Sequence, residues 1–172
     1  MPEEQIILVD KDNTQIGKGG KLETHRKGLR HRAFSIFIIN DRGELMLQKR
    51  ALGKYHSGGL WTNTCCGHPR DGEDVAVAAH RRLGEEMNFD CDLKEILSFH
   101  YEAQVSDTLR ENEIDHVFVG EYEKDPILNP EEASDWRWVS FPDLAEDIEK
   151  NPQNYTYWIK VVLLDIREKI GK

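Results

Sequence analysis

A charged segment in the middle of the chain has the spacing of a cation-binding helix face. Arg82, Glu85 and Glu86 lie three and four residues apart, so a helix would place them side by side. Carboxylates in this arrangement hold Mg²⁺ against a diphosphate, because a hard cation prefers oxygen ligands and takes the rest from phosphate and water. The same spacing also fits an exposed helix with ordinary ion pairs from Arg82 to Glu86 and from Arg81 to Glu85. The segment alone leaves both interpretations open.

Two adjacent cysteines precede this segment and offer a second kind of chemistry. Cys65 and Cys66 are poorly placed for a disulfide framework, so reduced thiols are expected. A thiol has a reference pKa of about 8.5, and modest tuning therefore allows either protonation state near neutral pH. Such a group can add or remove a proton, although a free cysteine is often simply a buried structural residue. The pair by itself does not decide between these roles.

The charged segment resembles the Nudix box, whose usual form is G-x5-E-x7-R-E-U-x-E-E-x-G-U, with U an apolar residue. The positions that fit are Gly67, Glu73, Arg81, Leu83, Glu85, Glu86 and Phe89. Arg82 replaces a glutamate that Nudix hydrolases use as a metal ligand, which weakens the interpretation as a hydrolase of a nucleoside diphosphate derivative. Asn88 replaces a helix-ending glycine, a small change because asparagine also tolerates the left-handed conformation.

Flanking motifs make the resemblance more specific. WTNTCCGHP at residues 61–69, ENE at 111–113 and H-x5-H-R-A-F-S at 25–35 resemble the type 1 isopentenyl diphosphate isomerases, which carry a degenerate Nudix box directly after the cysteine motif. The resemblance implies an enzyme of isoprenoid biosynthesis that interconverts isopentenyl diphosphate and dimethylallyl diphosphate by protonation and deprotonation, through a tertiary carbocation. A Nudix hydrolase is the alternative, and a catalytically inactive Nudix-like binding module is a third interpretation.

The same resemblance implies two metal ions. One ion, Mn²⁺, Zn²⁺ or Mg²⁺, has three imidazoles and two carboxylates as ligands: His25, His31, His68, Glu111 and Glu113. A mixed nitrogen and oxygen set is compatible with each of these metals. The second ion, Mg²⁺, is held by Glu86 and by oxygens of the substrate diphosphate. The remaining histidines are assigned to ordinary structural roles: His56, His80, His100 and His116.

The resemblance assigns proton transfer to two stations, which are Cys66 and Glu113 with its neighbour Tyr101. Two stations are required, because the proton that is added and the proton that is removed belong to different carbons. Cys65 is assigned to packing.

The remaining assignments concern the carbocation and the diphosphate. The aromatic face of Trp158 is the candidate partner of the carbocation, since its quadrupole attracts positive charge, and Trp61 is the fallback. Four cationic side chains are assigned to the diphosphate: Lys21, Arg50, Lys54 and Arg82.

Composition sets limits on the class of protein. The chain has 172 residues, 38% hydrophobic and 32% charged, which fits one globular domain over residues 1–172. A net charge of −9 argues against a nucleic-acid binder, because phosphate-backbone affinity needs clustered cations. No apolar run approaches a membrane span and the N-terminus does not read as a secretory signal, so we expect no membrane contact and a cytoplasmic location. A monomer and a homodimer are both compatible with the sequence.

The elements that must position these residues are expected to form a sheet with helices. Alternating or apolar runs predict strands at 6–9, 33–40, 44–50, 95–105, 114–122 and 136–139. Helical spacing and capping residues predict helices at 73–87, 140–150 and 155–170. Strands interleaved with a few helices predict an α/β (α+β) fold, a Nudix-like mixed β-sheet sandwiched between helices.

Overall fold

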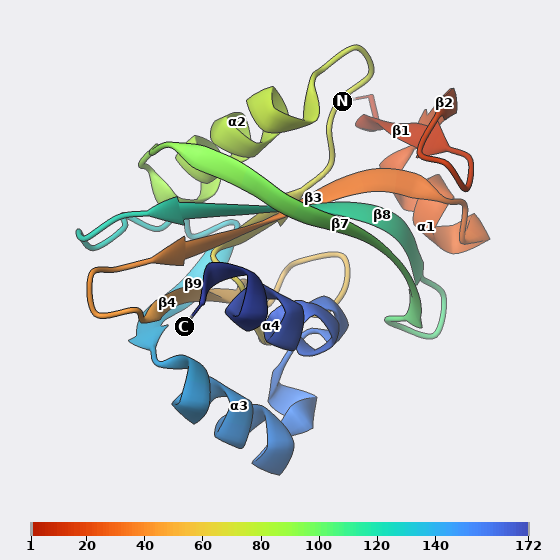
Figure 1. Cartoon of the computed structure of the whole chain (residues 1–172). Helices are drawn as coiled ribbons and strands as arrows, with labels where there is room; N and C mark the ends of the chain where they lie inside the picture. The colour runs from red at the N-terminus through yellow and green to blue at the C-terminus, as the bar shows by residue number, and fades with distance from the viewer. Residues whose placement is uncertain (1, 172) are drawn as a thin grey trace.

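The computed structural model describes residues 2–171, which form one mixed sheet of nine strands and four α-helices (Figure 1). The strands are β1 (Gln5–Val9), β2 (Gln15–Gly20), β3 (His31–Ile39), β4 (Leu45–Arg50), β5 (Trp61–Thr62), β6 (Cys65–Gly67), β7 (Leu93–Gln104), β8 (Arg110–Glu121) and β9 (Ala133–Val139). The helices are α1 (Lys21–Lys27), α2 (Val75–Met87), α3 (Phe141–Lys150) and α4 (Tyr157–Ile170), with a 3₁₀ turn at Pro152–Asn154.

Strand β3 lies at the centre of the sheet and sets the register of the strands around it. It runs parallel to β8, with His31 opposite Glu113, and antiparallel to the short strand β6, with Ser35 opposite Cys66. The β7–β8 hairpin then places Tyr101 opposite Glu113. Segments far apart in the sequence therefore meet beside β3.

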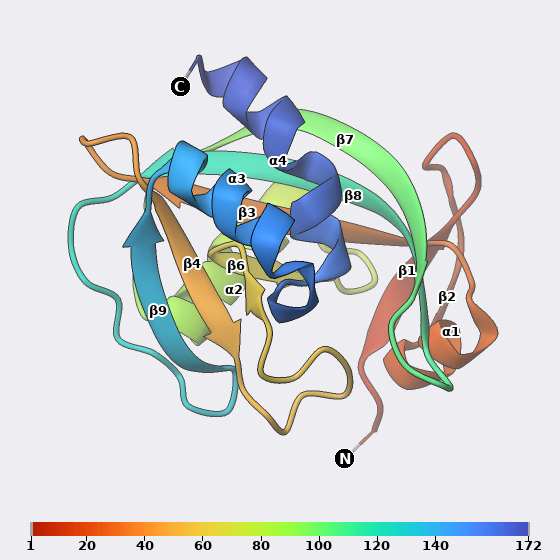
Figure 2. The ribbon, with the colours of Figure 1, turned by 90° about the horizontal axis from the view of Figure 1, so that it is seen from below.

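Helices cover both faces of this sheet, as predicted. Alternate side chains of β3 point to opposite faces. Phe34 and Ile36 pack in the cluster beneath α2, whereas Phe37 and Ile39 pack against α3 and α4 on the other face (Figure 2). Burial of a large apolar side chain contributes about 1.5–3 kcal/mol, so both layers stabilise the central strand.

The observed helix ends agree closely with the ends predicted from the sequence. Helix α2 begins at Val75 rather than at residue 73, because the Asp74 side chain caps it by accepting from the backbone N–H groups of residues 76 and 77. It ends at Met87 and is capped by Asn88, whose φ of 56° is the left-handed conformation expected of the residue that replaces glycine. Ser140 caps α3 as predicted, while α4 begins at Tyr157, two residues later than expected, because the 3₁₀ turn precedes it.

Several elements near the N-terminus and the site were not predicted. Strand β2 has the glycine-rich sequence QIGKGG, and α1 has only seven residues, so neither has a clear periodic pattern. The short strands β5 and β6 were also missed. Strand β8 begins at Arg110 rather than at Ile114, which places the ENE motif inside a strand. No helix within residues 2–171 is long and apolar enough to cross a membrane.

Candidate active site

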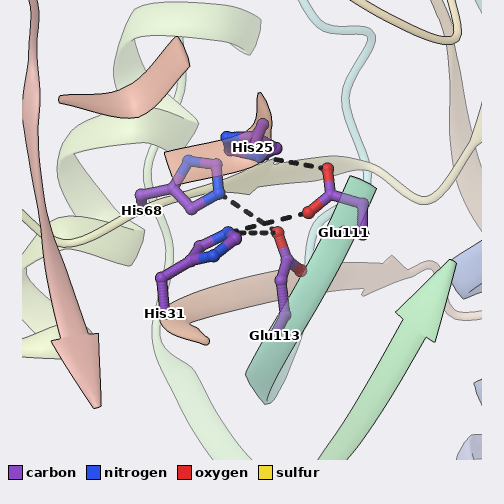
Figure 3. A group of neighbouring side chains, drawn as sticks. All are labelled: His25, His31, His68, Glu111 and Glu113. Atoms are coloured by element: carbon purple, nitrogen blue, oxygen red, sulfur yellow. Dashed lines mark hydrogen bonds and ion pairs between the residues drawn. The ribbon is translucent and has the colours of Figure 1, made fainter. Parts of the chain in front are cut away.

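Five buried side chains bring their ligand atoms to within 4.8 Å of one another (Figure 3). They are the residues predicted to hold one metal ion: His25, His31, His68, Glu111 and Glu113. Helix α1 supplies the first histidine, β3 the second and the segment after β6 the third. The two glutamates occupy alternate positions of β8, so their side chains project from the same face.

Two of the histidines are oriented as metal ligands commonly are. His25 Nδ1 lies 2.6 Å from the backbone oxygen of Lys21, and His31 Nδ1 lies 2.8 Å from that of Leu29. A carbonyl oxygen only accepts, so each Nδ1 carries a proton and Nε2 is the nitrogen that would bind a metal. Neither Nε2 atom has a hydrogen-bond partner among residues 2–171.

The unpartnered nitrogens face carboxylate oxygens, which completes a donor set for a cation. His25 Nε2 lies 3.3 Å from Glu111 Oε1, and His31 Nε2 lies 3.3 Å from Glu113 Oε1. Glu111 Oε2 is also buried without a hydrogen-bond partner among residues 2–171, and such burial is costly. A divalent cation would bind these unpartnered atoms, so the five residues fit a metal site.

The two carboxylates interact strongly with each other. Burial, and then the charge of Glu111, raise the pKa of Glu113 to about 7. Burial also works to raise the pKa of Glu111, but the imidazoles of His25, His31 and His56 beside it hold that pKa well below its usual value. Two buried acids so close together need positive charge nearby, which a bound cation would supply.

A single cavity adjoins this cluster and collects the other predicted site residues. Its lining includes Lys21, Arg50, Lys54, Cys66, Arg82, Glu86, Tyr101, Glu113 and Trp158. His25 and His31 are fully buried and lie behind it. Trp61, the fallback aromatic residue, is not in the lining and lies instead beside the Arg137 guanidinium, 4.4 Å from its ring centroid.

The predicted proton-transfer groups lie at this cavity on β6, β7 and β8, of which β6 and β8 both pair with β3. The Tyr101 hydroxyl donates to Glu113 Oε2 at 2.8 Å, and Glu113 Oε1 lies 3.1 Å from His68 Nε2. Cys66 contributes its thiol from β6, and burial raises its pKa to about 12. Cys65 points the other way, into the apolar cluster beneath α2, as its assignment to packing requires.

Lys21, Lys54 and Arg82 line one part of the cavity, here called its cationic end, and Arg82 comes from the charged face of α2. Arg82 Nη2 lies 2.5 Å from Glu86 Oε1, and Arg81 Nη1 lies 3.3 Å from Glu85 Oε2, so the ordinary ion pairs are present. The exposed-helix interpretation is nevertheless wrong for Arg82 and Glu86, whose side chains are only 17% and 6% exposed. Gln48 Nε2 also donates to Glu86 Oε2 at 2.7 Å, which fixes that carboxylate at the cavity wall.

Glu132, which the sequence analysis did not single out, connects two of the predicted diphosphate-binding residues. Its Oε2 lies 2.5 Å from Lys54 Nζ and its Oε1 lies 3.1 Å from Arg82 Nη2. Burial works to raise the pKa of Glu132, but Arg82 and Lys54 lower it to about 2. The loop that carries Lys54 is thereby attached to α2.

His56 is a second residue that the sequence analysis missed. It was assigned an ordinary structural role, but it is buried, lines the cavity and places Nε2 2.6 Å from Glu111 Oε1. In the sequence, only its position two residues after Lys54 hinted at a role in the site. The folded loop is what brings His56 to the cavity. The other three histidines bond to side chains outside the cavity: His80 to Asp90, His100 to Asn112 and His116 to Glu95.

Glycine is required where β6 approaches α2. A Cβ at Gly67 would lie 2.8 Å from Phe34 Cζ and 3.1 Å from Arg82 Cγ. The missing side chain therefore lets Arg82 reach the cavity directly beside Cys66.

Comparisons with known proteins agree with this geometry. A family model described as NUDIX domain matches residues 29–159. "Isopentenyl-diphosphate Delta-isomerase 2" of Photorhabdus laumondii is 53% identical and covers 94% of this chain and 91% of its own. "Isopentenyl-diphosphate Delta-isomerase" of Serratia proteamaculans is 48% identical and covers 95% and 92%.

Solved structures share the fold at much lower identity. A Deinococcus radiodurans protein superposes with a TM-score of 0.71 at 21% identity, covering 86% of this chain and 90% of its own. A MutT protein from Methanosarcina mazei Go1 superposes with a TM-score of 0.69 at 17% identity, covering 83% and 96%. These likenesses show a Nudix fold, and the sequence relatives are far closer. The chain therefore belongs to the isopentenyl-diphosphate Delta-isomerase family and carries a NUDIX domain.

Proposed function

We propose that this cavity interconverts isopentenyl diphosphate and dimethylallyl diphosphate, with Cys66 and Glu113 as two separate proton stations. The observation that carries the proposal is the placement of both groups in one cavity whose other wall is cationic. A reaction that adds a proton at one carbon and removes one from another needs two such groups. The named relatives, at about half identity over most of the chain, support the same reaction.

The diphosphate would occupy the cationic end of the cavity. Lys21, Lys54 and Arg82 supply charge there, and their present partners are carboxylates that a diphosphate resembles. Burial lowers the pKa of Lys21, so an anion bound beside it would stabilise the charged form. The five-carbon chain then extends toward Cys66 and Tyr101.

The proton balance of the reaction closes within these residues. One station adds a proton to the terminal alkene carbon of isopentenyl diphosphate, which leaves a tertiary carbocation at the branched carbon. The other station removes a proton from the carbon next to it on the diphosphate side, and the new double bond forms there. Neither step consumes an oxidant or releases phosphate.

The carbocation between these steps needs a partner that does not capture it. Trp158 lines the cavity, and its ring already attracts a cation, with the Arg50 guanidinium carbon 5.5 Å from the ring centroid. We assign this ring to the carbocation, because an aromatic face attracts positive charge without forming a bond.

Two cations complete the proposal. At the His25, His31, His68, Glu111 and Glu113 cluster, a bound Mn²⁺, Zn²⁺ or Mg²⁺ ion would offset the two carboxylates and fix their orientation. At Glu86, a Mg²⁺ ion shared with the diphosphate would neutralise part of the substrate charge.

A Nudix hydrolase is the competing function, and one assay separates the two. The protein is incubated with isopentenyl diphosphate and Mg²⁺, and both the dimethylallyl isomer and free phosphate are measured. We expect the isomer without phosphate, because Arg82 occupies the position of a metal-binding glutamate and pairs with Glu86 instead. Rapid phosphate release without isomerisation would support the hydrolase.

A further inference from the structure

Asn63 connects two parts of the proposed catalytic machinery. It lies in the turn between β5 and β6, and it is fully buried. Its Oδ1 accepts a hydrogen bond from the Trp158 indole Nε1 at 3.1 Å and one from the Cys66 thiol at 3.8 Å. We propose that Asn63 is a positioning residue that holds the Cys66 thiol and the Trp158 ring in a fixed relation to each other. This inference rests on the isomerase function proposed above.

The nitrogen of the Asn63 amide anchors the residue from its other end. Nδ2 donates to the backbone oxygen of Ile36 at 3.1 Å and to that of Cys65 at 2.7 Å. The first bond attaches Asn63 to the central strand β3, and the second fixes the backbone directly before Cys66. A rotation of the amide would turn donors toward donors in a buried site, which is costly, so the orientation is unique.

Two threonines extend this connection to helix α4. Thr62 Oγ1 donates to Asn63 Oδ1 at 2.8 Å and lies 2.8 Å from Thr156 Oγ1. Because the Thr62 proton is used on Asn63, Thr156 donates to Thr62. Thr156 is the residue before α4, and its backbone nitrogen donates to Trp61 O at 3.0 Å. The first turn of α4, which carries Trp158, is therefore attached to the segment that carries Cys66.

Fixed geometry of this kind matters more for turnover than for binding. Misplacement of a reacting group by about 1 Å can cost about 10²-fold in rate. Within residues 2–171, the hydrogen bonds of the Asn63 side chain go to the Cys66 thiol, the Trp158 indole, Thr62 and two backbone oxygens, and none goes to Lys21, Lys54 or Arg82. Loss of Asn63 is therefore expected to lower kcat while leaving KM for the diphosphate substrate little changed.

The test compares Asn63→Ala with Asn40→Ala. Asn40 is a buried asparagine whose side chain bonds, within residues 2–171, only to residues 42 and 44 of the β3–β4 hairpin, so it reports the general cost of losing a buried amide. We expect Asn63→Ala to lose about 10²-fold in kcat and Asn40→Ala to keep the native value once both are shown to be folded.

Two further measurements use no substrate. The exchange of the Trp158 indole N–H with solvent is followed by NMR, with the signal assigned from Trp158→Phe. The alkylation rate of Cys66 is measured in a background in which Cys65 and Cys91 are alanine. Both rates should rise about fivefold or more in Asn63→Ala, the effect of losing one ordinary hydrogen bond, and neither should rise in Asn40→Ala.

The outcomes separate the inference from the isomerase proposal. A folded Asn63→Ala protein with native kcat, native indole exchange and native alkylation would overturn the positioning role. If this variant does not fold, Asn63→Asp decides, because it keeps an acceptor oxygen in the same place and, when neutral, can donate to one of the carbonyls. Its Trp158 indole should exchange slowly, and exchange as fast as in the denatured chain would refute the role. Failure of the native protein to form the dimethylallyl isomer would instead refute the function alone.

Discussion

Tyr101 and Glu113 share a hydrogen bond across the β7–β8 hairpin, with the tyrosine hydroxyl 2.8 Å from Glu113 Oε2. The other oxygen of the same carboxylate lies against His31 and His68 of the metal cluster. Glu113 therefore has one oxygen toward Tyr101 and one toward the histidines of the proposed metal site. This arrangement allows its proposed roles in proton transfer and in metal binding to be tested by separate mutations.

Tyr101→Phe and Glu113→Gln should fail in different ways. Tyr101→Phe removes only the hydroxyl that contacts Oε2, so we expect lower kcat with full metal content. Glu113→Gln keeps the shape but loses the charge, so both turnover and metal retention should fall, since an amide is a poorer ligand than a carboxylate. Elemental analysis of the two purified variants checks this. Full metal content in Glu113→Gln would remove it from the ligand set.

The two adjacent cysteines provide a second matched pair. Cys66→Ala should fold and keep its metal, yet lose about 10²–10⁴-fold in kcat, the usual contribution of a positioned acid or base. This corresponds to roughly 3–5 kcal/mol of barrier. Cys65→Ala removes a thiol buried beneath α2 and should retain most of its activity. Steady-state assays of both decide: a fully active Cys66→Ala beside an inactive, folded Cys65→Ala would move the assignment to the neighbouring residue.

Replacement of His56 should weaken metal retention rather than substrate binding. Its Nε2 lies 2.6 Å from Glu111 Oε1, so it helps to hold this carboxylate in place. Loss of a residue that orients a ligand typically costs 10–100-fold in metal affinity. We therefore expect His56→Ala to release its metal to a chelator at about 10–100-fold lower chelator concentration than the native protein. His80→Ala is the control, because His80 bonds to Asp90 at the surface, and equal retention in both variants would contradict the prediction.

The fold and the site were not equally accessible from the sequence. The three predicted helices, such as α2, follow local rules, and their ends were predicted to within two residues. The start of β8 was missed because Glu111 and Glu113 belong to the candidate metal cluster, so the strand lacks the apolar alternation that usually marks one. Helix α1 was missed because seven residues form a stable helix only through packing.

Proximity within the site depends on pairing between distant strands. The parallel register of β3 and β8 sets His31 opposite Glu113, and no local pattern encodes a crossover pairing of that kind. The resemblance to a family named the five residues of the candidate metal cluster without giving the distances between them. It did not find His56 or Glu132, whose roles depend on how the loop after β4 folds over the cavity.

Isomerisation should incorporate solvent hydrogen into the product. In the proposed reaction the added proton and the removed proton belong to different carbons, and they pass through Cys66 and Glu113 at separate positions in the cavity. Both groups can exchange with water between turnovers, so a reaction in D₂O should give dimethylallyl diphosphate with deuterium in a methyl group, detectable by mass spectrometry and NMR. Prolonged incubation should also label the remaining substrate, because the reaction runs in both directions. Product free of solvent label would instead indicate that one proton moves within the substrate, and the assignment of two stations would then be withdrawn.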